Sequence, residues 1–389
     1  MLDICWRQWS ALGAYATVPP ETGRAIDPEA LICATMFYGR YDPRMFDEAL
    51  DWMAANARSV SLDRLKMIAG LYGPRCKACL GASLEVVASR GGSPRFASTA
   101  ARWKEFRLSE REELFLSWGQ GKGPGVKNTD PTFLAWGFLR SKPALRGLSG
   151  KPDMGNDANL FLRLRKLFGV TSRASVVGYL LLKGEGNSTR IARAVHVNQR
   201  NAYGILEEMV EGGFLERWTG GREVVYRIDR ERWGDILGKG GDVGGGVGGG
   251  AGMGIGIDVG RDGVGGLGES VGQSRGKNKG VDMGKGYDVG QGGSEGGGAG
   301  MGRGAGIVFV GWADVFSAFQ QLLEDWAEND ESYSTPYLAS SRLREIAPGI
   351  ARKLAAGDVG YRIPDLHHHR GEDYLAAFAE HIQAYLSHL

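Results

Sequence analysis

Residues 172–233 read SRASVVGYLLLKGEGNSTRIARAVHVNQRNAYGILEEMVEGGFLERWTGGREVVYRIDRERW, and they decide how the rest of the chain is interpreted. Apolar residues recur at spacings of three and four in three successive runs, which predicts three short amphipathic helices. The second helix is expected to begin at a cap formed by Asn187 or Ser188, and the third at a cap formed by Asn198. His196 and Val197 form the turn between them. The inward-facing residues, helix by helix, are Val176, Val177, Leu180 and Leu181, then Ile191, Ala192 and Val195, and finally Ala202, Ile205, Leu206 and Met209.

The residues after the third helix predict a β-hairpin. Gly212-Gly213 ends the helix, and FLERW at 214–218 and REVVYRI at 222–228 each have the composition of a strand. Thr219-Gly220-Gly221 supplies the tight turn between the two strands. The stretch therefore predicts helix, helix, turn, helix and hairpin, in that order.

This order resembles the winged helix-turn-helix DNA-binding domains of bacterial regulators such as the MarR and ArsR groups. The residues that carry the likeness are STRIARAVHVNQRNAYGILEEMVEGGFLERW at 188–218, followed by a short wing and REVVYRI. In such families the helix matching residues 198–211 enters the major groove, and the wing matching residues 218–224 contacts the backbone or the minor groove. The resemblance implies sequence-specific binding of double-stranded DNA by a bacterial-type transcriptional regulator.

Polar residues near the start of the third helix are the candidates for contact with bases. Arg200 can pair with guanine through two hydrogen bonds, and Gln199 or Asn201 can pair with adenine. Gly204 costs about 1 kcal/mol of helix stability relative to alanine, which fits a close approach of the backbone to DNA. Residues 188–190 are expected to bind phosphate, and the arginines at 217 and 222 flank the wing. The complete set of expected DNA-binding residues is Ser188, Thr189, Arg190, Asn198, Gln199, Arg200, Asn201, Tyr203, Arg217 and Arg222.

The charge of this segment agrees with DNA binding. Residues 160–236 contain 13 Lys/Arg and 9 Asp/Glu, an excess of four positive charges. Glu207, Glu208 and Glu211 are poor neighbours for phosphates, so only the first two turns of the third helix can approach DNA. Because a fold does not fix a function, a second hypothesis stays open. On that hypothesis the protein is an adaptor or antitoxin-like protein that uses the winged helix to hold a protein partner.

Glycine divides the chain into segments. Of its 63 glycines, 32 lie in residues 238–306, where too little apolar surface remains to offset the entropy of ordering. The expected fold is mainly α with a small β-hairpin wing, in a chain of 389 residues. Its expected parts are an N-terminal helical domain at 1–92, an irregular connector with short helices at 93–155, the winged helix-turn-helix at 156–237, a disordered Gly-rich linker at 238–306 and a C-terminal helical domain at 307–389.

Helix signals mark both ends of the chain. Helix starts are expected at Asp27-Pro28, Asp42-Pro43 and Ser61, because each carries a cap or a first-turn proline. Residues 46–71 fit the first half of a second winged helix, and they fit an αα-hairpin equally. After Ile307 three helices are expected, the middle one broken at Pro348. Homodimerisation, binding of a protein partner or signal sensing is assigned to these terminal units.

Composition excludes several classes of protein. The net charge of +2 and a pI near 8.3 exclude a polyanion-binding arm and an acidic tail, so any basic patch must be local. Four cysteines are too few and too uneven for a secreted disulfide scaffold, and the start MLDICWRQWSALG lacks the features of a signal peptide. Because no run of 18 apolar residues occurs, no membrane span is expected. These features predict a cytoplasmic protein.

Candidate metal and catalytic motifs are weak. Cys76 and Cys79 have the spacing of a zinc knuckle, but two more ligands are needed and neither a CxxC nor a CxxH lies nearby. Pairing with Cys5 or Cys33 stays open as an alternative. The adjacent histidines at 367–369 favour an exposed polar turn, and no nucleophile lies in a known catalytic motif. We therefore expect no metal, no cofactor and no enzymatic activity.

Overall fold

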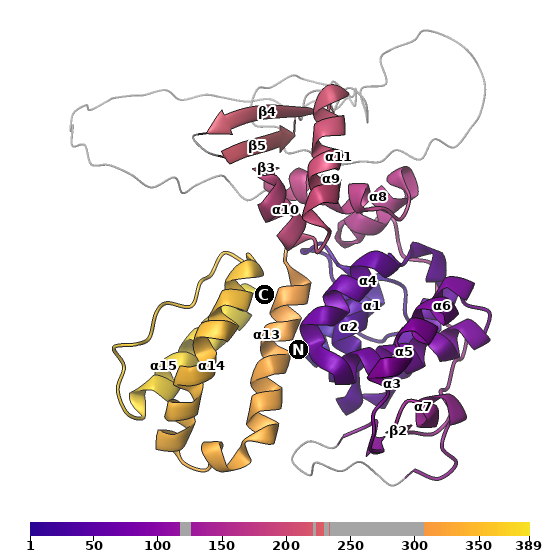
Figure 1. The fold of residues 1–389 in the computed structure, drawn as a ribbon, viewed down its shortest axis with the longest axis vertical. Coiled ribbons are helices and arrows are strands. Elements are labelled where there is room, and N and C mark those ends of the chain that lie inside the picture. Colours follow the sequence, from indigo (N-terminus) through magenta and orange to yellow (C-terminus); the bar gives the residue numbers. More distant parts are fainter. Residues whose placement is uncertain (117–125, 221–222, 229–232, 234–306) are drawn as a thin grey trace, which may run out of the picture. The chain divides into compact units, whose positions relative to one another are not determined.

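Helices make up most of the structure, and in the part of the chain that it describes the strands form two small sheets (Figure 1). The computed structural model describes residues 1–116, 126–220, 223–228, 233 and 307–389. The expectation of a mainly α fold is confirmed. The expected Gly-rich linker at 238–306 lies outside the described residues. Among the described helices, none is long and apolar enough to cross a membrane.

Aspartate caps and first-turn prolines begin two N-terminal helices where the sequence predicts them. The Asp27 carboxylate accepts a hydrogen bond from the Ala30 N–H at 3.2 Å, and the Asp42 carboxylate accepts one from the Met45 N–H at 3.0 Å. Helix α2 is buried at every residue, so it lies at the centre of the N-terminal bundle. The helices of this part are α1 (Leu2–Ala11), α2 (Pro28–Tyr38), α3 (Pro43–Ala55), α4 (Leu62–Ala69), α5 (Gly73–Ser89) and α6 (Pro94–Arg102).

After α4 the chain continues into the long helix α5, and the helix α6 follows it with no hairpin between them. The irregular segment beyond α6 contains the helix α7 (Pro131–Ala135) and two short strands, β1 (Glu112–Glu113) and β2 (Phe138–Leu139), which pair in parallel. Trp136 fixes this segment on α5. Its ring fills the space beside Gly81, where a Cβ would come within 2.3 Å of it, and its Nε1 donates to Glu85 Oε2 at 2.8 Å.

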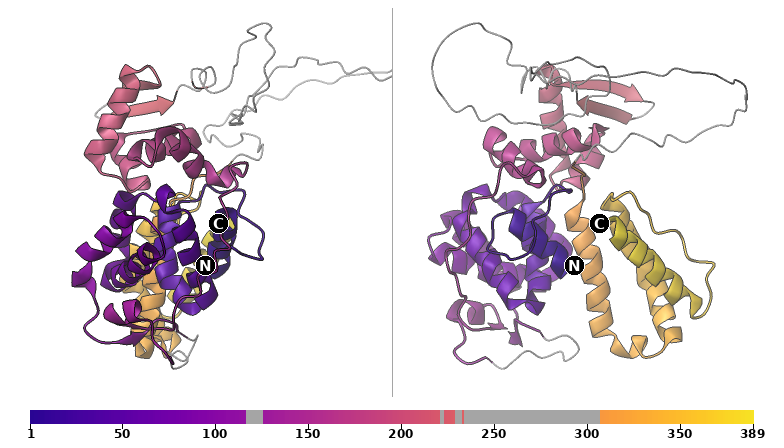
Figure 2. Two further views of the ribbon diagram at one scale, coloured as in Figure 1. Left: turned by 90° about the vertical axis from the view of Figure 1, so that its right-hand side faces the viewer. Right: turned by 180° about the vertical axis from the view of Figure 1, so that it is seen from behind.

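Residues 156–228 form a second group of helices (Figure 2). Their apolar core also includes Ala25 and Phe309. The three expected helices are present, each ending or beginning at the residues that the sequence indicates. The three-stranded antiparallel sheet has the order β3-β5-β4, with Leu215 opposite Ile228 and Gly186 opposite Tyr226. Sequence patterns missed its first strand. The elements are α8 (Leu160–Phe168), α9 (Ser172–Lys183), β3 (Glu185–Gly186), α10 (Ser188–Ala194), α11 (Gln199–Glu211), β4 (Leu215–Gly220) and β5 (Glu223–Ile228).

The C-terminal part contains the expected helices, with one correction. They are α13 (Trp312–Glu328), α14 (Pro336–Ala356) and α15 (Asp373–His388). The predicted break at Pro348 is wrong, because α14 runs through this residue. A proline inside a helix removes one main-chain hydrogen bond, but burial of one continuous face on both sides of it holds the helix together. That face consists of Ala339, Leu343, Ala347, Ile350 and Leu354.

Helix α13 joins the N-terminal and C-terminal helices into one core, in which it lies between α2 and α14 (Figures 1 and 2). The Tyr38 hydroxyl on α2 donates to the main-chain oxygen of Phe316 on α13 at 2.7 Å. The Trp312 indole at the start of α13 donates to the main-chain oxygen of Ala25 at 2.9 Å. The segments expected as separate domains at 1–92 and 307–389 therefore share a core.

Short 3₁₀ turns complete the described elements. They occupy Gly39–Tyr41, Ala57–Ser59, Gly70–Tyr72, Lys104–Phe106, Asp157–Asn159 and Asp330–Tyr333.

Candidate nucleic-acid interface

Two asparagine caps and a tight turn build the α10–α11 pair. Asn187 Oδ1 accepts a hydrogen bond from the Arg190 N–H at 2.7 Å, and Asn198 Oδ1 accepts one from the Arg200 N–H at 2.9 Å. These caps and the turn at His196 are confirmed. His196 has a φ of 49°, a left-handed conformation uncommon outside glycine. The chain thus changes direction between α10 and α11 within residues 195–198.

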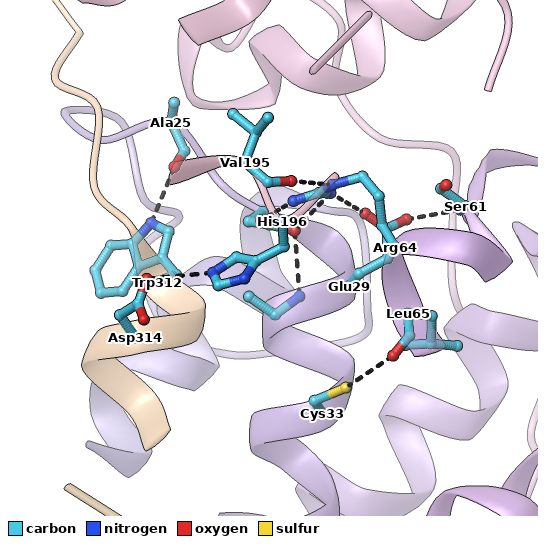
Figure 3. Close-up of polar contacts among 12 residues, drawn as sticks. Ala25, Glu29, Cys33, Ser61, Arg64, Leu65, Val195, His196, Trp312 and Asp314 are labelled. Carbon is cyan, nitrogen blue, oxygen red and sulfur yellow. Dashed lines mark hydrogen bonds and ion pairs between the residues drawn. The ribbon is translucent and has the colours of Figure 1, made fainter. Parts of the chain in front are cut away.

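The turn before α11 is fastened to the helices beneath it. Arg64 Nε on α4 donates to the main-chain oxygen of Val195 at 2.7 Å (Figure 3). On the other side of the turn, His196 Nε2 lies 3.2 Å from Asp314 Oδ2 on α13. Contacts from two distant parts of the sequence therefore fix where α11 begins.

A buried cluster of charges supports this contact. The Arg64 guanidinium lies 2.5 Å from Asp27 Oδ2 and 2.5 Å from Glu29 Oε2, and Arg165 on α8 lies 2.6 Å from the same Glu29 oxygen. Glu29 also accepts a hydrogen bond from the Ser61 N–H at 2.7 Å (Figure 3). Burial alone would raise the pKa of Asp27, but the adjacent Arg64 holds it below its ordinary value. Asp27 is therefore ionised and paired with Arg64 at neutral pH.

The structure places most of the expected DNA-binding residues on one exposed surface at the start of α10 and α11. Ser188 is half-buried and accepts a hydrogen bond from Gln199 Nε2 at 3.2 Å. Tyr203 is 48% exposed. Of the described residues, none forms an ion pair with Arg200, so its guanidinium is available to a partner molecule. The exposed members of the set are Thr189, Arg190, Asn198, Gln199, Arg200, Asn201 and Tyr203.

The structure describes one of the two expected wing arginines. Arg217 on β4 is exposed, but its Nη1 lies 2.7 Å from Glu207 Oε2 on α11. The Tyr226 hydroxyl donates to the other oxygen of Glu207 at 2.6 Å, which ties the hairpin to the rear of α11. Burial, together with this carboxylate, raises the pKa of Tyr226. Arg217 therefore forms an exposed ion pair within the chain, and Arg222 lies outside the described residues.

Sequence reasoning missed a groove beside α10, which we call the α10 groove. It has a volume of about 790 Å³ and lies between α10, the start of α11, β5, the end of α14 and residues 358–362 after it. Five expected residues line it, namely Ser188, Thr189, Arg190, Gln199 and Tyr203. Arg193 and Arg362 line it too. Spacing on α10 could have indicated Arg193, which lies three residues after Arg190, whereas no local pattern indicates Arg362.

The candidate metal motifs are not assembled into a site. Cys76 and Cys79 lie buried on α5, where the Cys76 thiol donates to the main-chain oxygen of Cys33 at 3.7 Å and the Cys79 sulfur lies 3.8 Å from Met36 Sδ. Burial raises the pKa of the Cys79 thiol to about 12. The side chain of His367 is exposed beside Asp365. Across the described ranges, no three His, Cys, Asp or Glu residues are grouped so as to hold a metal ion.

Comparison of the chain with protein-family models, with curated proteins and with solved structures found no match.

Proposed function

We propose that this protein binds double-stranded DNA through a winged helix-turn-helix formed by α9, α10, α11 and the β3-β5-β4 sheet, and that it acts as a transcriptional regulator. The observation that carries the proposal is the first turn of α11. There Gln199, Arg200 and Asn201 are all exposed beyond the Asn198 cap. These side chains have the donors and acceptors that read base edges in the major groove.

The distribution of charge along α11 supports an approach by its N-terminal half. Glu207 is engaged by Arg217, and Glu208 is engaged by Arg173 of α9, so the acidic rear of the helix is partly neutralised from within. Arg190 and Thr189 lie exposed on the neighbouring helix and suit contacts with the phosphate backbone. Base contacts are thus assigned to α11 and backbone contacts to α10.

An adaptor that binds a protein partner remains the second candidate, because one observation favours it. Trp218 on β4 is 45% exposed. It pairs with Val225 and lies on the face of the hairpin that points away from Tyr226. Tryptophan is enriched at the centres of protein interfaces. On this proposal the wing, and not α11, carries the main contact.

Selection of bound fragments from random duplex DNA by the full-length protein tests the first candidate. A recovered consensus is then titrated with the wild type, with Arg200→Ala and with Arg95→Ala, which removes an exposed arginine from α6 as a matched control. Arg200→Ala should weaken binding by about 1–3 kcal/mol and relax one base position. Arg95→Ala should bind as the wild type does.

The absence of salt-dependent binding to any duplex would overturn the DNA proposal. If Arg200→Ala weakens binding to all sequences equally, with no change in base preference, Arg200 contacts a phosphate and not a base. The adaptor candidate is supported if Trp218→Ala abolishes capture of a protein partner while Arg200→Ala leaves it intact.

A further inference from the structure

Arginines from residues 156–228 and from the C-terminal part of the chain line the α10 groove together. Arg190 and Arg193 line it from α10, and Arg362 lines it from the opposite wall. All three side chains are exposed, and none is ion-paired with any of the residues that the structure describes. Three guanidinium groups around one groove repel one another unless an anion lies between them.

The two carboxylates of the groove are already engaged. Glu223 Oε2 accepts a hydrogen bond from Asn187 Nδ2 at 2.9 Å. Asp358 Oδ2 lies 2.9 Å from Lys183 Nζ at the end of α9. Neither carboxylate is therefore placed as the partner of the three arginines, and the groove keeps a positive excess.

The segment before Arg362 contacts residues 156–228 at Lys183 and contacts the C-terminal part at Gly311 and Tyr385. Besides the ion pair with Asp358, Lys183 Nζ lies 3.5 Å from the main-chain oxygen of the same residue. The Gly311 N–H donates to the Gly357 oxygen at 2.9 Å, and a Cβ at Gly357 would come within 2.6 Å of the Tyr385 hydroxyl. These contacts hold residues 357 and 358, and Arg362 lines the groove shortly after them in the chain.

A second observation in the groove also points to a ligand. The Tyr179 side chain is 1% exposed and lines the groove, and its hydroxyl oxygen interacts with the Arg190 guanidinium while its O–H donates to no described residue. Burial raises the pKa of Tyr179 despite the nearby Arg190, so the hydroxyl keeps its proton and can donate it to an oxyanion.

We propose that the α10 groove binds a phosphate group between Arg190, Arg193 and Arg362, and that this phosphate belongs to the backbone of DNA bound by α11. The inference rests on the proposed function for the source of the phosphate. Five residues of the expected DNA interface line the same groove, which argues for the DNA backbone. A volume of about 790 Å³ accommodates part of one strand and not a whole duplex. The C-terminal segment then contributes Arg362 to the DNA interface.

The first arm of the test measures the salt dependence of DNA binding by the full-length protein. The wild type, Arg362→Ala and Arg193→Ala are titrated with one duplex between 50 and 200 mM salt, and Arg370→Ala serves as the matched control, since it is exposed nearby in sequence but does not line the groove. Loss of one phosphate contact lowers the slope of log K against log salt by about one. The advantage of the wild type over either groove variant should shrink about threefold across this range.

The second arm uses inorganic pyrophosphate, which has the chemistry of phosphate but no base. Isothermal titration at low salt should show saturable binding by the wild type and by Arg370→Ala, and its loss in Arg362→Ala. Because Arg362 is exposed, its removal should leave the melting temperature unchanged, which separates lost binding from lost folding.

The outcomes separate this inference from the proposed function. If the wild type binds no duplex but its binding of pyrophosphate depends on Arg362, the DNA proposal fails and the phosphate comes from a small molecule. If DNA binds and Arg362→Ala matches Arg370→Ala in slope, the DNA backbone does not occupy the groove. If in addition pyrophosphate binding is absent or independent of Arg362, the phosphate site itself is overturned.

Discussion

Arg64 Nε on α4 donates a 2.7 Å hydrogen bond to the main-chain oxygen of Val195, 131 residues further along the chain. The same guanidinium pairs with the buried carboxylates of Asp27 and Glu29. One side chain therefore neutralises two buried charges and positions the turn that begins α11. The orientation of the candidate DNA-reading helix is consequently linked to the integrity of the N-terminal bundle.

Replacing Arg64 with methionine should lower the free energy of unfolding by about 3–5 kcal/mol, because it leaves two buried carboxylates short of a partner. Urea denaturation followed by tryptophan fluorescence measures this change. Asp27→Asn in the same background removes one uncompensated charge and should recover part of the loss. Equal stability of the single and double variants would show that lost packing, and not unpaired charge, causes the effect.

Stability should depend on pH through Asp27. Its pKa is lower in the folded protein than in the unfolded chain, because Arg64 outweighs the opposing effect of burial. Ionised Asp27 then stabilises the fold above the unfolded pKa of about 3.9, and this stabilisation is lost as the pH falls through the folded pKa. We expect the unfolding free energy of the wild type to fall below about pH 4, and that of Asp27→Asn to fall less steeply. Parallel curves would assign the acid sensitivity to other carboxylates.

Local features of the candidate interface could be predicted because neighbouring residues determine them. Asn198 caps α11, and Ala202, Leu206 and Met209 turn inward, as the spacing indicates. Caps and amphipathic spacing need only the residues within one or two turns. The short strand β3 could not be found in this way, because its two residues are a strand only through pairing with β5.

The second wall of the α10 groove could not be predicted from local sequence. Arg362 is separated from Arg193 by the whole segment 238–306, and it lines the groove four residues after Asp358, which pairs with Lys183. Such packing contacts are formed between residues that share no sequence pattern. The ion pair of Arg217 with Glu207 could not be predicted for the same kind of reason, since Glu207 lies on a different element.

Replacing Pro348 with alanine should stabilise α14. The helix continues through it, so the main-chain hydrogen bond to Arg344 is missing there. Pro348→Ala restores the donor and should raise the free energy of unfolding by about 1–3 kcal/mol. Urea denaturation measures the gain, with Ala355→Gly as a control that should lower stability. A destabilised Pro348→Ala variant would show that packing of α14 on α13 depends on the shape that proline imposes.

A substitution at Gly204 should change the stability of the fold and the affinity for DNA in opposite directions. It lies in the middle of α11, and a Cβ built at this position would have no described atom of the chain within 4 Å. Alanine should therefore raise the free energy of unfolding by about 1 kcal/mol. If the backbone of α11 approaches DNA closely at this position, the same methyl group should weaken binding to the selected duplex. Thermal denaturation and anisotropy titrations measure the two effects, and Glu211→Ala on the last turn of α11 is the control expected to leave affinity undiminished. A Gly204→Ala protein that is more stable and binds DNA as tightly as the wild type would show that this face of α11 stands away from the duplex.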